Sequence, residues 1–299
     1  MQIRHFSSIL ALALATVPQV AAGKAPTVLS PMGPWTVDYA EERCSLIRRF
    51  GDDEKSLVLQ IDSYGSPHQF RALVFGDYVP ASNRPTGKIS YKFTPDREYR
   101  QDQRAIFGKS GISNATSFLT AFSPNDISQK EYLKLSEEEV SRRMENLPKV
   151  RAEFEDATNS MTLRLVTLKE IELRLGNMVK PLAALRGCVD DLYNSWGLDP
   201  QPQHTRKRTP IPDTRSVRNV MQNYPTQMAL GGKSAFLSVR VMVNEQGEAG
   251  SCIVQNENVD KAFTDAVCAG LARHFEPALD AEGKPMSSFY QTIVTYLID

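Results

Sequence analysis

Hydrophobic and polar residues alternate along several short segments of this chain, most clearly in its C-terminal quarter. Within residues 236–243 apolar side chains recur at every second position, which predicts a strand with one buried face. Residues 244–247 suit a hairpin loop, because Gly247 readily adopts the left-handed backbone that such loops need. Residues 248–256 are then expected to form the returning strand.

A helical pattern follows these two strands. It begins near Asp260 and should end at Pro277, with apolar side chains three and four positions apart. The stripe consists of Phe263, Ala266, Val267, Gly270 and Leu271. A helical turn at residues 226–230 precedes the first strand, and a closing strand is expected at 288–298. The pattern predicts an α+β unit over residues 215–299, with a helical turn, a hairpin, a helix and a closing strand.

Residues 30–199 show strands first and a helix last. Short runs rich in β-branched and aromatic residues favour an antiparallel sheet or sandwich. These runs cover residues 35–39, 44–50, 56–63, 69–75 and 88–93, and two later runs cover 161–166 and 171–175. Helices are expected at 128–143 and at 177–196, where Gly197 ends the second one. This part is predicted to be a β-rich N-terminal domain with a C-terminal helix, of unknown function.

Two local signals lie inside this domain. Ser136 followed by Glu139 is typical of a capping box, which begins a turn of helix. The Gly-Lys-Ser-Gly sequence within residues 107–111 superficially suggests phosphate binding. It lacks the upstream glycine of a phosphate-binding loop, so a surface loop is expected there.

Proline and basic residues mark residues 200–214. The segment contains four prolines and the cluster Arg206, Lys207 and Arg208, without apolar periodicity. This composition predicts an extended, solvated linker between the two domains. Contact of the basic cluster with anionic lipid or an acidic partner is the alternative.

The C-terminal unit combines several spaced signals in one order. They are Tyr224-Pro225, Gly231-Gly232, the Val-Arg-Val-Met-Val strand, the Asn-Glu-Gln-Gly hairpin and the final Ile-Val-Thr-Tyr-Leu-Ile strand. Taken together, they resemble the C-terminal domain of TonB-family proteins over roughly the final quarter of the chain. The resemblance implies a bacterial periplasmic domain in which a small antiparallel sheet is packed by two helices. In energy transducers, this domain binds a short peptide segment of an outer-membrane transporter as a strand added to a sheet edge.

The resemblance also indicates which residues to examine. Tyr224 and Pro225 are expected to set the start of the domain, Gly247 the hairpin and Pro277 the end of the helix. The closing strand is the expected edge at which a partner binds. Its candidate contact residues are Phe289, Tyr290, Gln291, Thr292, Ile293 and Val294.

The N-terminus bears on the compartment. Arg4 and His5 precede a short apolar run, and the small residues at Val20-Ala21-Ala22 suit cleavage before Gly23. This pattern is typical of a secretory signal peptide at residues 1–22, and we expect a cleaved, periplasmic protein. The apolar run is shorter than the roughly 20 residues that a spanning helix needs. Retention of the segment as a membrane anchor is the alternative.

Cysteine usage agrees with export to an oxidising compartment. The chain has Cys44, Cys188, Cys252 and Cys268, an even number without Cys-x-x-Cys spacing. Four cysteines allow three pairings. Cys252 on a strand and Cys268 on the helix packed over it are expected to pair, which leaves Cys44 with Cys188. Buried thiols are the alternative, since cysteine is often buried without a disulfide.

Composition and motifs argue against several function classes. With 35 basic and 35 acidic residues the chain has no net charge, so it lacks an electrostatic footprint for nucleic acid. His5, His68, His204 and His274 are scattered, and no metal or cofactor site is expected. Asp190-Asp191 point in different directions on a helix, which favours a solvated face. An enzyme becomes plausible only if the fold brings His68 or paired carboxylates together in a cleft.

Two functional hypotheses follow. The first is a periplasmic protein-interaction module that binds a peptide strand or partner protein at a sheet edge. The partner could be an outer-membrane transporter. The second is an anchored TonB-type energy transducer for outer-membrane transport, which requires that the N-terminal segment is retained.

Overall fold

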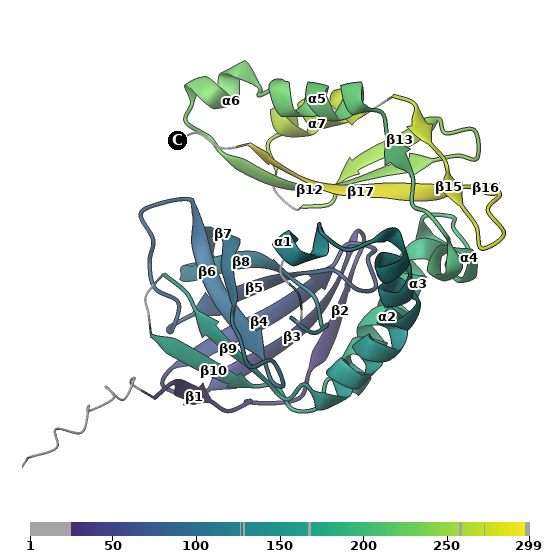
Figure 1. The fold of residues 1–299 in the computed structure, drawn as a ribbon. Helices are drawn as coiled ribbons and strands as arrows, with labels where there is room; N and C mark the ends of the chain where they lie inside the picture. Colours follow the sequence, from purple (N-terminus) through teal and green to yellow (C-terminus); the bar gives the residue numbers. More distant parts are fainter. Residues whose placement is uncertain are drawn as a thin grey trace, which may run out of the picture.

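The computed structural model describes residues 25–125, 127, 129–166, 169–256, 259–271 and 273–296. The predicted signal peptide at residues 1–22 lies outside the described residues. The protein is mixed α+β, with a large curled sheet in the N-terminal part and a smaller sheet above it (Figure 1).

Ten strands form the N-terminal sheet, in the order β1-β10-β9-β6-β7-β8-β5-β4-β3-β2. Their bounds are β1 Thr27–Leu29, β2 Thr36–Ala40, β3 Arg43–Gly51, β4 Ser56–Ser63, β5 Phe70–Gly76, β6 Thr86–Phe93, β7 Arg100–Ser110, β8 Ser113–Thr120, β9 Ser160–Arg164 and β10 Glu170–Arg174. All neighbours are antiparallel except β1 and β10, which are parallel. The sheet therefore ends at β1 on one side and at β2 on the other.

Helix α3 (Val179–Ser195) packs against β3 and β2 and contributes to the same core. Its buried side chains include Leu182, Leu185, Val189 and Tyr193, which recur at helical spacing and face the apolar side of the sheet. Helices α1 (Gln129–Tyr132) and α2 (Glu137–Ala157) precede it. A salt bridge between Arg186 of α3 and Glu155 of α2 joins these two helices.

The sequence predicted most of these elements but missed three strands, β1, β7 and β8. Residues 107–111, expected as a surface loop, lie mainly in β7, which pairs with β6 and β8. That expectation was wrong because β7 and β8 are rich in polar residues, and their pairing supplies stability that local propensity does not show. The helix expected at 128–143 is instead two helices. The capping box of Ser136 and Glu139 is confirmed at the start of α2.

The C-terminal unit contains a three-stranded antiparallel sheet in the order β13-β12-β17. Its strands are β12 Ala235–Val243, β13 Ala249–Val254 and β17 Ser288–Tyr296. Helices α5 (Thr214–Gln222), α6 (Thr226–Leu230) and α7 (Lys261–Leu271) lie on one side of it (Figure 1). Two short ladders complete it, formed by β11 Ile211–Pro212 with β14 Phe275–Glu276, and by β15 Ala278–Leu279 with β16 Pro285–Met286.

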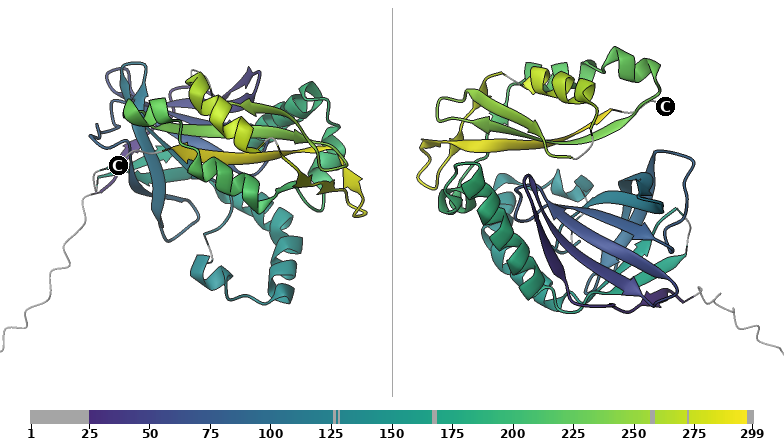
Figure 2. Two further views of the ribbon diagram at one scale, coloured as in Figure 1. Left: turned by 90° about the horizontal axis from the view of Figure 1, so that it is seen from above. Right: turned by 180° about the vertical axis from the view of Figure 1, so that it is seen from behind.

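The two faces of this small sheet have different partners. Leu237, Val239, Val241 and Val243 are buried on the helical side with the apolar residues of α7. The residues between them on β12 face the N-terminal domain, and both further views show the sheet lying over the end of the curled sheet (Figure 2). The alternation seen in the sequence thus separates a helix-covered core from a docking face.

The segment predicted as an extended, solvated linker is folded. Pro200–Thr205 forms α4, which Asp199 caps by accepting a hydrogen bond from the Gln201 amide. The side chain of Gln203 is buried and donates to the Ser287 carbonyl, and it accepts from the Ser288 hydroxyl at 2.7 Å. Pro200 occupies the first position of α4, where proline favours the start of a helix. The other prolines of the segment favoured an extended linker, so the helix was not predicted.

Candidate functional site

An arginine from the small sheet joins the two domains. Arg240 on β12 forms two close hydrogen bonds with the Glu42 carboxylate, at 2.7 and 2.9 Å from Nη2. The guanidinium lies over the Trp196 ring, with its Cζ 4.2 Å from the ring centroid. Its side chain is only 3% exposed and that of Glu42 19%. The Arg240 guanidinium thus makes both an ion pair and a cation–π contact at one largely buried position.

Polar side chains extend this contact. Gln255 donates to the carbonyls of Glu42 and Tyr64, and Gln291 donates to the Tyr64 carbonyl at 2.9 Å. The Tyr193 hydroxyl donates to the Gly65 carbonyl within the same loop of the N-terminal domain. The loop after β4 is therefore held by both α3 and the small sheet.

Aromatic packing completes the contact. Phe289 of β17 packs against Tyr193 and Trp196 of the N-terminal domain, with ring centroids 5.5 and 5.3 Å apart. Arg206, part of the predicted linker, lies over the Phe289 ring with its Cζ 5.0 Å from the centroid. Arg206 of the basic cluster thus contributes to this aromatic contact, whereas Arg208 pairs with Glu276 inside the C-terminal unit.

A groove opens beside β17, and we call it the rim groove. It has a volume of about 520 Å³ and lies between Gln291–Ile293 of β17 and the ends of β4, β5 and β8. Its other walls include Tyr64, Arg71, Tyr91, Leu119 and Thr120. A cavity of this size accommodates several side chains of an extended peptide.

The hydrogen-bond pattern of β12 determines which backbone groups of β17 point to the outer edge of the sheet, beside the rim groove. Ser238 accepts from the Gln255 amide, so Ser238 and every second residue of β12 turn their backbone groups to β13. The residues between them bond to β17, where Val239 is opposite Thr292. Gln291, Ile293 and Thr295 must therefore turn their backbone amides and carbonyls to the outer edge, where no strand of the described residues pairs.

The six residues proposed to contact a partner divide between the two faces of the sheet. Tyr290 and Val294 pack into the helical core, and Thr292 is on the same side by alternation. Phe289 is buried in the aromatic contact just described. Only Gln291, Thr292 and Ile293 line the rim groove.

Charged groups in the rim groove are paired. The Asp62 carboxylate is fully buried and accepts from Arg71 Nη2 at 2.7 Å and from the Ser45 hydroxyl at 2.6 Å. Arg100 Nη2 pairs with Asp96 at 3.1 Å, while its Nη1 donates to the Ala121 carbonyl. These pairs leave the groove without excess charge, so it favours backbone and apolar contacts over an ionic ligand.

The four residues expected to shape the C-terminal unit have clear local roles. Tyr224 packs against Phe263 and Tyr296, and Pro225 precedes α6 and accepts its first backbone hydrogen bonds. Gly247 has φ +80°, and a Cβ there would lie 2.1 Å from the Phe275 carbonyl oxygen, so only glycine fits. Pro277 does not end α7, because that helix stops at Leu271 and Pro277 lies between β14 and β15.

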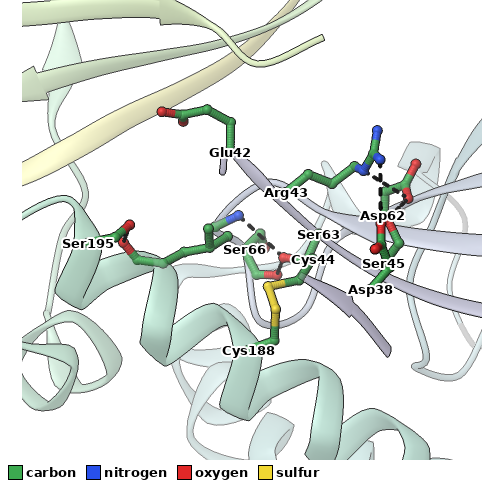
Figure 3. Close-up of a disulfide and its surroundings, with 12 residues drawn as sticks. Asp38, Glu42, Arg43, Cys44, Ser45, Asp62, Ser63, Ser66, Cys188 and Ser195 are labelled. Atoms are coloured by element: carbon green, nitrogen blue, oxygen red, sulfur yellow. Dashed lines mark hydrogen bonds and ion pairs between the residues drawn. A yellow bond between two sulfur atoms is a disulfide. The ribbon is translucent and has the colours of Figure 1, made fainter. Parts of the chain in front are cut away.

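Both expected disulfides are confirmed. Cys252 on β13 joins Cys268 on α7, and Cys44 on β3 joins Cys188 on α3. Figure 3 shows the Cys44–Cys188 bond beneath Glu42, whose carboxylate points toward the small sheet. The Cys44–Cys188 bond fixes α3 against the strand that leads directly from Glu42.

Titratable groups away from these contacts do not form a catalytic arrangement in the part of the chain that the structure describes. Asp190 pairs with His204 at 2.6 Å, and Asp191 is exposed. His68 does not line the rim groove. Across the described ranges, no cluster of three or more His, Cys, Asp or Glu side chains is placed to hold a metal ion.

His68 nevertheless gives a pH prediction. Burial, with smaller contributions from Arg151 and Arg186, lowers its pKa to about 4. The unfolded chain, with a pKa near 6.5, therefore binds a proton first as the pH falls, and stability is lost between about pH 6.5 and 4. His68→Gln should reduce the loss of unfolding free energy between pH 7 and pH 5 by about 1 kcal/mol, after allowance for partial exposure. Urea unfolding at both pH values tests this, and an unchanged pH dependence contradicts it.

The sequence did not identify the residues that join the domains. Alternation placed Arg240 on the face away from the core, yet nothing in the sequence indicated that Glu42 would be its partner.

No helix among the described residues is long and apolar enough to cross a membrane. Comparison with known proteins adds no assignment, since no family model, curated protein or solved structure matches this chain.

Proposed function

We propose that this protein is an exported protein-interaction module of the bacterial periplasm that binds an extended peptide segment along β17. One observation carries the proposal: the outer edge of β17 is unpaired among the described residues and borders the rim groove. An unpaired edge offers a row of backbone donors and acceptors to an incoming strand.

The contact between the domains defines which part of the edge is accessible. Phe289 is buried at one end, so residues 291–295 form the stretch available to a partner. A strand added there would place alternate side chains toward Leu119 and Tyr64 in the rim groove. The N-terminal domain thereby supplies a second wall for recognition, in addition to the sheet edge. The partner is a peptide strand or a protein that carries one, with outer-membrane transporters as candidates from the resemblance.

The edge can be tested without disturbing the sheet. Ile293→Pro removes an outward amide and should weaken partner capture at least about tenfold, because a proline on an edge blocks strand addition. Ile293→Ala keeps the amide and is the matched control for the lost side chain. The measurement is photo-crosslinking in cells from a benzoylphenylalanine at Gln291, followed by identification of the captured protein.

The amount of partner captured by each variant shows whether a partner binds at the β17 edge. Equal capture by Ile293→Pro and Ile293→Ala, with both proteins folded, would show that the edge is not used. Thr292→Pro is unsuitable for this purpose, because the Thr292 amide faces β12 and its loss should destabilise the sheet itself.

Export is tested separately. Mass spectrometry of the protein from its source cells should find an N-terminus near Gly23 in the periplasmic fraction. A protein that begins at Met1 and fractionates with membranes would instead favour the anchored energy transducer.

A further inference from the structure

A second groove lies between the domains, and we call it the β2–β13 groove. It has a volume of about 530 Å³ and is lined by β2 and the turn after it, by α3 and by the inner face of β12 and β13. β2 is the terminal strand of the large sheet and β13 a terminal strand of the small one. Two strand edges without a neighbour among the described residues therefore meet at one cavity.

The groove is acidic. Glu41, Glu42 and Asp191 line it, with Arg240 as the single cation in its wall. Glu42 is neutralised by Arg240. Glu41 and Asp191 have no ion pair with any described residue, and both are exposed. Two uncompensated carboxylates thus face a cavity that is large enough for a ligand.

Aromatic groups add a second, independent feature. Tyr39 lines the groove with 60% of its surface exposed, which is unusual for a tyrosine on a strand. The indole nitrogen of Trp196 is buried in the groove wall without an acceptor among the described residues. An exposed ring such as that of Tyr39 attracts a cation over its face, whereas the Trp196 ring is already covered by the Arg240 guanidinium.

The backbone of β13 offers further contacts. Because Gln255 donates to Ser238, Ile253 also turns its backbone toward β12, and Cys252 and Val254 turn theirs outward. Ser251 and Ile253 from the same strand line the groove with their side chains. A chain segment in the groove therefore lies next to free backbone donors and acceptors.

We propose that the β2–β13 groove is a docking site for an extended segment of a partner protein that carries lysine or arginine side chains. The cationic side chains pair with Glu41 and Asp191 and contact the Tyr39 ring. The backbone of the segment lies along the outer edge of β13. This site is separate from the rim groove and does not depend on the function proposed for β17.

Fluorescence anisotropy with defined peptides tests the proposal on the full protein. The probe is a labelled nine-residue peptide of alternating valine and lysine, and its neutral counterpart contains glutamine in place of lysine. We expect the lysine peptide to bind at least about tenfold more tightly at low salt, and to weaken as salt is added. Equal affinity of the two peptides would overturn the proposal.

Paired variants locate the binding. Glu41→Gln with Asp191→Asn should weaken the lysine peptide about fivefold to tenfold, because two exposed ion pairs are removed. The matched control is Glu138→Gln with Glu145→Gln on α2, which removes the same charge from an exposed helix far from the groove. An equal loss in both pairs would mean attraction by net charge alone and would overturn the assignment.

Two further probes separate a peptide site from a small-cation site. N-methylation of the backbone of the lysine peptide should weaken binding, since it blocks pairing with β13. Spermidine should compete only weakly, because it has no backbone amides or carbonyls to pair with β13. Full competition by spermidine, or no effect of N-methylation, would overturn the docking of a peptide.

Discussion

Replacement of Cys44 and Cys188 by alanine should lower the free energy of unfolding by about 5 kcal/mol, the largest stability effect expected in this protein. The two residues are 144 positions apart, and opening so long a loop gives the unfolded chain much conformational freedom. Both side chains are buried, so alanine avoids placing a new polar group in the core. Urea unfolding followed by circular dichroism measures the difference.

The Cys252–Cys268 disulfide provides the control. Cys252 and Cys268 are only 16 positions apart, and the same reasoning gives about 3 kcal/mol for their replacement by alanine. The expected result is therefore a ranking in which the long loop matters more. The reverse ranking, with both variants folded, would show that the stability supplied by these bonds does not follow loop length.

Arg240→Met should loosen the contact between the domains at a cost of about 3 kcal/mol, because removal of one partner leaves the other partner of a buried ion pair uncompensated. The Glu42 carboxylate would lose its cation, and Trp196 would lose the guanidinium above its ring. Protease sensitivity of residues 206–214 and the midpoint of urea unfolding both report the change. Faster cleavage there is expected, because this segment packs on Phe289, which is itself part of the contact with Tyr193 and Trp196.

Two controls make this result specific. Lys261→Met removes one partner of an exposed ion pair, with Asp265, and should cost less than about 1 kcal/mol. The double variant of Arg240→Met with Glu42→Gln should be more stable than the sum of the single effects predicts, because neither charge is then left alone. Additive effects would show that the two residues act independently.

Sequence patterns predicted several elements of the C-terminal unit closely, but they predicted two helices where the described residues form three. The missed helix is α5, which has few apolar residues to mark a helical stripe. The helical turn at 226–230 matches α6, and the strand predicted at 236–243 differs from β12 by one residue. Strict alternation in β12 and helical spacing in α7 each produce one buried face, so local patterns were sufficient. The pairing of Cys252 with Cys268 followed from the same placement of a strand under a helix.

Other features depend on partners far away in the chain. β7 and β8 contain few apolar residues and are held by their neighbours in the sheet. The basic residues of the predicted linker look solvated by composition, yet Arg206 covers Phe289, which is 83 positions later. The Arg240–Glu42 pair spans 198 positions. No local signal specifies such contacts, so the grooves between the domains could not be predicted.

The parallel pairing of β1 with β10 limits the order in which the chain can fold. Thr27 lies opposite Ile171, and the same separation of 144 residues divides Cys44 from Cys188. Contacts at such long range form slowly, because a large loop must close before they add stability. β1 cannot pair before β10 is present, and α3 follows β10 only a few residues later. The pairing of β1 and the Cys44–Cys188 bond, which lies next in the chain to Glu42, therefore both require almost the whole N-terminal domain to be present.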